Sequence, residues 1–279
     1  MIFLHVLQHT HWFGSFTSRV ASKNSCLWGH ADYLTLFENN VEKMKEFFEQ
    51  RNYNKFKHIV FVSEEGKDSF IKIFPEMKSK TIVCNNLIDN KKIEKLAKEK
   101  IELKKENITT FLNVGRHDEK QKKLTRIIDA AKMLKENKFN FRILFVGEGK
   151  DTNFYKEEVK KKNLESNIIF IGKKENPYPY FEISDCVILT SDYEGYPVVF
   201  LESFILNKPI ITTKVSDYKE VEGKYGFITN KNVNDIYEKM KEFINNGFSI
   251  KEKFNANKYN ENIIKKLEKL FWKEEKCQL

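Results

Sequence analysis

The segment Ser191–Glu202 carries the side chains best suited to chemistry, and it reads Ser-Asp-Tyr-Glu-Gly-Tyr-Pro-Val-Val-Phe-Leu-Glu. It follows an apolar run at 185–190 that is typical of a buried strand. Pro197 suits the first turn of a helix, because its φ is already fixed and its missing N–H would be unpaired there. The segment therefore predicts a strand-to-helix turn at Glu194–Tyr196.

A helix start of this kind is a potential anion site. Its backbone N–H groups and the positive end of its dipole would stabilise a diphosphate. Gly195 removes a side chain where a ligand must approach the backbone. Glu202 would lie about 7–8 Å further along the helix axis, far enough to reach a sugar ring. On spacing alone, a capping role for Glu194 and a solvated position for Glu202 are equally compatible.

The elements that must position these residues form a regular series from about residue 108 onward. Nearly continuous apolar runs alternate there with segments of helical period, and the runs lie at 110–114, 141–146, 167–171, 185–190, 209–213 and 226–229. Such runs are typical of parallel strands that are buried on both faces. Strict alternation with helices predicts a doubly wound α/β sheet, with ligands at the carboxyl ends of its strands.

The first part of the chain is less complete. Strands are indicated only at 25–29, 59–62 and 81–84, and helices near 36–50, 66–73 and 90–101. The tail at 260–276 has apolar residues at helical spacing and should dock on an apolar surface. We therefore expect three segments: a partial amino-terminal lobe with a linker (1–106), a complete lobe (107–257) and a carboxyl-terminal helix that packs back toward the first lobe (258–279).

Composition excludes several classes of protein. The chain has 279 residues with 49 Lys plus Arg against 40 Asp plus Glu, a net charge of +9. Lys far outnumbers Arg and is spread along helices, which favours solvated faces over nucleic-acid binding, although a Lys excess also suits an anionic membrane surface or a phosphorylated substrate. The four cysteines show no paired spacing, which argues against disulfide scaffolds and zinc fingers. No apolar run approaches the roughly 20 residues of a membrane span, and Met1–Leu7 lacks the features of a signal peptide.

The spacing from Glu194 to Glu202 resembles the E-G-[FY]-P-x-x-x-x-E signature of the family 4 nucleotide-sugar glycosyltransferases, which have the two-lobed GT-B fold. Asn113–Arg116 resembles the family's opening strand and its phosphate-contacting Arg, and Lys122 lines up with its second basic phosphate ligand. Further similarities lie at Val146–Gly149, Ile171–Gly172, Asn176–Pro177 and Lys208–Ile211. The resemblance extends over roughly residues 25–275.

The resemblance implies a GT-B type α/β fold, with a complete doubly wound Rossmann-like donor lobe and a partial Rossmann-like acceptor lobe. It implies transfer of a hexose-type sugar from a nucleotide diphosphate sugar, a UDP-sugar, to a glycan or lipid-linked acceptor with retention, in surface or capsular polysaccharide synthesis. Two basic side chains would neutralise the departing diphosphate, so no metal and no cofactor beyond the donor is expected. The donor-binding residues would be Arg116, Lys122, Glu202, Gly195, Tyr196, Pro197, Val198 and Gly172.

Two residues are candidates for catalysis. By resemblance, Glu194 would contact the donor sugar while Glu202 holds the ribose hydroxyls. Leu27–Tyr33 resembles the end of an amino-lobe strand in which many family members carry a His that points toward the donor, so His30 is the second candidate. A lone His is more often structural, and that interpretation remains open.

The sequence departs from the family pattern in several places. Lys123 and Asn207 replace glycines, and Val215–Asp217 replaces a glycine-rich turn. Asn207 is tolerable because Asn accepts a left-handed helix cap. Residues 1–20 match nothing in the family, whose first strand and glycine loop are not found, so we expect a truncated product or one half of a split enzyme. The alternative function is a donor-lobe protein that binds nucleotide without transfer.

Two rival classes make different predictions. A basic nucleic-acid-binding protein predicts duplex binding with steep salt dependence. A nicotinamide oxidoreductase is disfavoured, because Thr152 stands where a dinucleotide fingerprint needs its third Gly. We expect a cytoplasmic protein, with a peripheral contact to the anionic inner face of the membrane.

Overall fold

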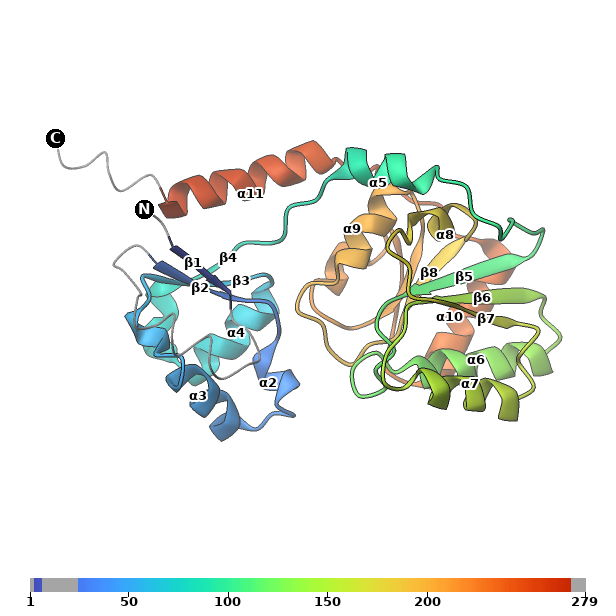
Figure 1. Ribbon diagram of the computed structural model, residues 1–279, viewed down its shortest axis with the longest axis horizontal. Helices are drawn as coiled ribbons and strands as arrows, with labels where there is room; N and C mark the ends of the chain where they lie inside the picture. The colour runs from blue at the N-terminus through green and yellow to red at the C-terminus, as the bar shows by residue number, and fades with distance from the viewer. Residues whose placement is uncertain (1–2, 7–24, 272–279) are drawn as a thin grey trace. The chain divides into compact units, whose positions relative to one another are not determined.

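The computed structural model describes residues 3–6 and 25–271, which divide into two compact units (Figure 1). Among these residues, the smaller unit takes those up to Ile88, Tyr193–Pro197 and those from Asn257, and the larger unit takes Asp89–Asp192 and Val198–Ala256. Residues 89–106, expected in the amino-terminal segment, fall in the larger unit. The reason is that helix α5 (Asn90–Ala97) packs against α8 (Tyr178–Glu182) and α9 (Val198–Ile205).

The larger unit is built on a six-stranded parallel sheet of order β10-β9-β8-β5-β6-β7. Its strands are β5 (Thr109–Val114), β6 (Phe141–Val146), β7 (Ile168–Gly172), β8 (Cys186–Leu189), β9 (Ile210–Thr213) and β10 (Gly226–Thr229). Read from β7, this is the order 3-2-1-4-5-6 of a doubly wound sheet. All six apolar runs of the sequence are confirmed as strands, and so is the α/β class.

Helices cover both faces of this sheet, which is why its strands are apolar along most of their length. Figure 1 shows α6 (Leu124–Glu136), α7 (Thr152–Lys161) and α10 (Val233–Asn246) on one face and α5, α8 and α9 on the other. The apolar residues of α6 recur at helical spacing on one face, and Leu124, Ile127, Ile128, Ala131 and Leu134 are all buried. A short 3-10 helix, Tyr218–Glu220, precedes β10.

The smaller unit contains a four-stranded parallel sheet of order β1-β2-β3-β4. Its strands are β1 (Phe3–Val6), β2 (Ser25–Gly29), β3 (His58–Phe61) and β4 (Thr81–Val83). The expectation of no placeable strand before residue 25 was wrong, because β1 pairs in parallel with β2 along all four of its residues. A four-residue segment with a His in it gives too weak a pattern, and the neighbouring strand supplies the hydrogen bonds that define it. The rest of the unmatched segment lies outside the described residues.

Helices α2 (Tyr33–Leu36), α3 (Val41–Glu49) and α4 (Glu64–Ile73) accompany an aromatic core in this unit, with 3-10 turns at Tyr53–Lys55 and Pro75–Lys80. Phe48 is fully buried and lies 4.8 Å from Phe70, centroid to centroid, in an edge-to-face arrangement. A second cluster joins the sheet to α11 (Ala256–Phe271), where Ile263 packs with Cys26, Val60 and Cys84. Because this four-stranded sheet is small, contacts between large aromatic side chains supply buried apolar surface that stabilises the unit.

Candidate functional site

The larger sheet reverses its strand order between β5 and β8, and this is where ligands bind in doubly wound sheets. Residues 115–123, called here the basic loop, follow β5, and Thr190–Asp192 follow β8. The two segments are in direct contact: the backbone N–H of Asp192 donates to the carbonyl oxygen of Gln121 at 2.8 Å. The basic loop is therefore fixed at the switch point of the sheet.

The basic loop holds both cations that the sequence predicted as phosphate ligands. Arg116 is exposed, and its Nη2 donates to Oε1 of Gln121 at 2.9 Å, inside the same loop. The side chain of Lys122 lies against Gly115, with its Cε 3.7 Å from the point where a Cβ on that glycine would be. The fold thus carries the two residues on one loop at the carboxyl edge of the sheet, while their roles remain predictions.

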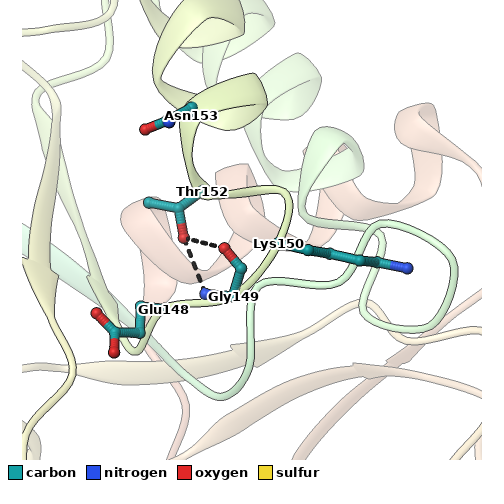
Figure 2. Close-up of a pocket in the computed structure, with 5 residues that line it drawn as sticks. All are labelled: Glu148, Gly149, Lys150, Thr152 and Asn153. Carbon is teal, nitrogen blue, oxygen red and sulfur yellow. Dashed lines mark hydrogen bonds between the residues drawn. The ribbon is translucent and has the colours of Figure 1, made fainter.

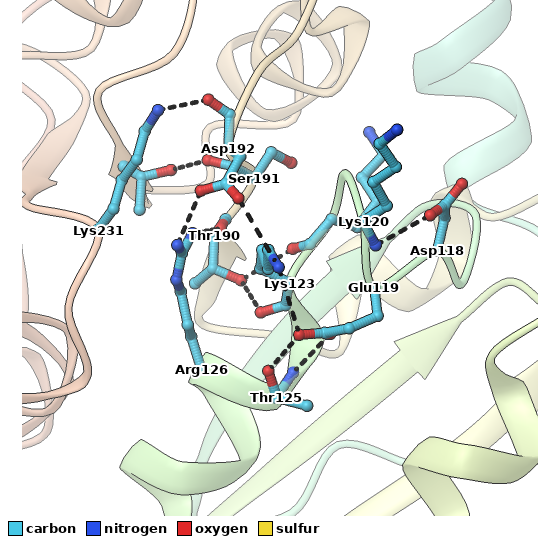
Figure 3. A network of polar contacts seen from close by, with 12 residues as sticks. Asp118, Glu119, Lys120, Lys123, Thr125, Arg126, Thr190, Ser191, Asp192 and Lys231 are labelled. Atoms are coloured by element: carbon cyan, nitrogen blue, oxygen red, sulfur yellow. Dashed lines mark hydrogen bonds and ion pairs between the residues drawn. The ribbon is translucent and has the colours of Figure 1, made fainter. Parts of the chain in front are cut away.

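A network of polar contacts joins the basic loop to the residues that follow β8 (Figure 3). Arg126, from α6, donates from Nη1 to the carbonyl oxygen of Thr190 at 2.9 Å and pairs through Nη2 with Oδ1 of Asp192 at 2.7 Å. Lys231 donates to the carbonyl oxygen of Asp192. The sequence alone did not predict this network, because some of the bonded residues lie more than 60 positions apart. They also share no local motif.

The glycines of the turn after β6 are required by close contact between backbones. At Gly147, where φ is 139°, an added Cβ would lie 1.9 Å from the carbonyl oxygen of Gly115, and at Gly149 it would lie 2.3 Å from that of His117. Backbone bonds join the same loops: Gly115 N–H donates to Val146 O at 3.0 Å, and His117 N–H to Glu148 O at 3.1 Å. Gly172 differs, because its φ of 78° favours glycine but nothing lies within 4 Å of an added Cβ.

A hollow of about 340 Å³ lies at the start of α7, lined by Glu148, Gly149, Lys150, Thr152 and Asn153 (Figure 2). The Thr152 hydroxyl accepts a hydrogen bond from the backbone N–H of Gly149 at 2.9 Å. It also lies 2.9 Å from Nδ1 of His117. The hydroxyl therefore connects the glycine turn to the basic loop at the lining of the hollow.

His117 is a buried residue of this region that the sequence did not indicate as a candidate. Its side chain is fully buried, edge-on to Phe145, Tyr155 and Phe170. Burial lowers the pKa of its imidazole. Its Nε2 has no hydrogen-bond partner among the described residues. A single His next to a basic residue gives no periodic signal, so only the packing distinguishes it from a surface His.

Acid is expected to destabilise the larger unit through His117. Because burial lowers the folded-state pKa below 6.5, the unfolded chain binds more protons as the pH falls through 6.5, so the stabilising contribution of the neutral ring is lost there. His117→Asn keeps a polar group near Thr152 but cannot titrate. In urea unfolding between pH 7 and 5, the parent should lose up to about 1.4 kcal/mol per pH unit more than the variant. Equal slopes would contradict this assignment.

Glu202 lies on α9, half-buried, and accepts a hydrogen bond from the Tyr178 hydroxyl at 3.1 Å. Burial raises the pKa of the Glu202 carboxyl, and the bond from Tyr178 only partly opposes this. In turn, burial and the neighbouring carboxylate raise the pKa of Tyr178 to about 12. The carboxylate is therefore incompletely compensated, and further hydroxyl donors would stabilise its charge.

The turn Tyr193–Pro197 belongs to the smaller unit, where Glu194 is buried, with 7% of its surface exposed. Gly195 packs against the backbone of the exposed His30, since an added Cβ would lie 1.9 Å from the His30 carbonyl oxygen. The structure thus brings Gly195 and His30 together and gives the glycine a steric reason other than ligand approach. Tyr196 is buried, and its hydroxyl lies 3.2 Å from that of Tyr259.

The helix expected after Pro197 is present: α9 begins at Val198, the next residue, whose side chain is 38% exposed.

Asn207 adopts the left-handed conformation that its residue type allows, with φ 52°. Lys123, which the resemblance aligned with a glycine, and Asp217, in the segment that it aligned with a glycine-rich turn, are also left-handed, at 51° and 57°. The departures from the glycine pattern therefore keep the backbone that glycine would favour.

Residues 3–6 and 25–271 contain no group of three or more His, Cys, Asp or Glu side chains that could hold a metal ion. The expectation of a metal-independent site remains a prediction. In the same part of the chain, no helix is both long enough and apolar enough to cross a membrane.

Comparison with known proteins identifies the family. Residues 92–266 match the family model described as "Glycosyl transferases group 1", so the chain belongs to this family of glycosyltransferases. An uncharacterized glycosyltransferase of Methanocaldococcus jannaschii is 28% identical over 224 residues, which are 70% of this chain and 55% of that protein. A capsular polysaccharide biosynthesis glycosyltransferase of Staphylococcus aureus is 32% identical over 170 residues, 58% of this chain and 44% of that protein. The chain thus spans about half the length of these relatives.

A solved structure shares the fold. The crystal structure of the Anabaena protein HepE in complex with UDP and glucose superposes with a TM-score of 0.76 at 18% identity, covering 95% of this chain and 77% of that one. The likeness supports the GT-B type α/β fold, with parallel Rossmann-like sheets, that the sequence predicted.

Proposed function

We propose that this protein transfers a hexose-type sugar from a UDP-sugar to a glycan or lipid-linked acceptor, with retention of anomeric configuration, in surface or capsular polysaccharide synthesis. The observation that carries the proposal is the basic loop, which presents Arg116 and Lys122 at the switch point of a doubly wound sheet in a group 1 glycosyltransferase chain. The UDP and glucose bound to HepE and the capsular role of the staphylococcal relative support the donor and the acceptor class.

The proposed roles follow from the charge changes of the reaction. The bond between the sugar's anomeric carbon and the diphosphate oxygen breaks, an acceptor oxygen bonds to that carbon on the same face, and the acceptor's proton leaves with UDP. Negative charge grows on the diphosphate, where Arg116 and Lys122 would stabilise it. Glu202 would accept hydrogen bonds from the ribose hydroxyls, and Glu194 and His30 would contact the donor sugar, in keeping with a family 4 signature at Glu194–Glu202.

The test is release of UDP from a panel of UDP-sugars in the presence of polyprenyl-linked and free glycan acceptors. We expect one UDP-sugar to turn over, with the product keeping the anomeric configuration in NMR spectra. Glu194→Gln should slow release by about a hundredfold, because it removes a charge next to the developing positive charge of the sugar, while UDP binds as to the parent. Binding of no UDP or UDP-sugar would contradict the proposal.

A narrower second function is nucleotide binding without transfer. The residues that match the family model, 92–266, fall mostly in the larger unit, which carries Arg116, Lys122 and Glu202. This function predicts UDP binding by calorimetry with no sugar released from any donor, so the same panel distinguishes it from transfer.

A further inference from the structure

The basic loop is held from one side by the two residues Thr190 and Asp192, which follow β8. The Thr190 hydroxyl donates toward the carbonyl oxygens of Lys122 at 3.2 Å and Lys123 at 3.0 Å. The backbone N–H of Asp192 donates to the carbonyl oxygen of Gln121, the residue before Lys122. Three successive carbonyl groups of the loop are thus fixed. Thr190 is only 1% exposed, so water competes little for its hydrogen bonds.

Arg126 locks these same two residues onto α6. Its planar guanidinium bonds the Thr190 carbonyl through one nitrogen and the Asp192 carboxylate through the other, as Figure 3 shows. A fork that bonds two separate acceptors fixes orientation as well as distance. The Arg126 side chain is 17% exposed, so the pair is partly shielded from solvent.

The loop needs such support because Lys123 has a left-handed backbone, with φ 51° and ψ 47°. This conformation is unfavourable for a residue with a side chain, and it persists where surrounding contacts over-determine it. The bonds from Thr190 reach the carbonyl of Lys123 itself and that of Lys122 before it. The Thr190 hydroxyl therefore bonds directly to the segment that holds the left-handed residue.

We propose that Thr190 and Arg126 are positioning residues that hold the basic loop so that Lys122 and Arg116 meet the diphosphate of the donor. This inference rests on the proposed function. Neither residue touches the donor in this role: both act through the backbone of the loop. Without them, the loop would have to be ordered when the diphosphate binds, and that entropic cost lowers affinity for phosphates but not for the nucleoside.

The test compares UDP with uridine, which has the base and ribose but no phosphate. Thr190→Val keeps the shape of the side chain and removes its hydroxyl. In calorimetric titrations at 10 °C, the variant should bind UDP about tenfold more weakly than the parent, the equivalent of one hydrogen bond, and uridine within about twofold. Thr190→Ser restores the hydroxyl and should bring UDP affinity back to within about threefold of the parent. If Thr190→Val fails to fold, Arg126→Gln serves as the second variant. It should likewise weaken UDP binding and leave uridine binding nearly unchanged.

Thr229→Val is the matched control. Thr229 is also a buried threonine at the end of a strand, and its hydroxyl donates to the carbonyl of Thr212 at 3.3 Å, away from the basic loop. Its ratio of UDP to uridine affinity should equal that of the parent. An unchanged ratio in both Thr190→Val and Arg126→Gln would overturn the inference, as would equal losses for the two ligands. A parent that binds no UDP would instead contradict the proposed function, and this inference with it.

Discussion

Glu202→Ala is expected to weaken UDP binding by about a hundredfold, the loss typical when charge-assisted hydrogen bonds to a partly buried carboxylate are removed. Burial raises the pKa of this carboxyl although Tyr178 donates to it, so its charge is only partly compensated in the protein alone. The two hydroxyls of a ribose would complete that compensation, and binding should therefore depend strongly on the carboxylate. Calorimetric titration with UDP measures the loss.

One comparison variant and one comparison ligand make this expectation specific. Glu182→Ala removes an exposed glutamate of α8 and should leave UDP affinity within about twofold of the parent. Glu202→Ala should lower the affinity for UMP as much as the affinity for UDP, because both ligands carry the ribose. A loss confined to UDP would place Glu202 at the phosphates. UDP affinity equal to that of the parent would remove Glu202 from the nucleotide site altogether.

The larger unit could be predicted from the sequence nearly strand by strand, because most of its strands are buried and each shows a nearly continuous apolar run. Phe141–Val146, buried at every residue, is the clearest example. The smaller unit was less predictable. The four residues Phe3–Val6 are too few to give a clear strand pattern in the sequence. They form a strand because they pair in parallel with β2.

The candidate site shows the same division between local and distant causes. Arg116, Lys122 and Glu202 could be named because they belong to short motifs, and the fold places two of them on one loop. Arg126 and Thr190 could not be named, because their importance comes from contacts across 64 positions of the chain. His117 was missed for a related reason: what sets it apart is burial among aromatic rings, which one sequence does not reveal.

Gly147→Ala is expected to destabilise the larger unit by about 4 kcal/mol or more. The φ of 139° is a conformation essentially restricted to glycine, which costs another residue about 1–3 kcal/mol. The new methyl group would also lie 1.9 Å from the Gly115 carbonyl oxygen, so the loops after β5 and β6 would have to separate and give up the bond from Gly115 N–H to Val146 O.

Gly223→Ala isolates the steric part of this effect. Gly223 is also left-handed, with φ 69°, but it is exposed and nothing lies within 4 Å of an added Cβ. The substitution should therefore cost only about 1 kcal/mol, the conformational penalty alone. Urea unfolding followed by circular dichroism at 25 °C compares the two. Similar losses would mean that the loops after β5 and β6 separate at little cost, and the inferred rigid backbone contact between these two loops would be wrong.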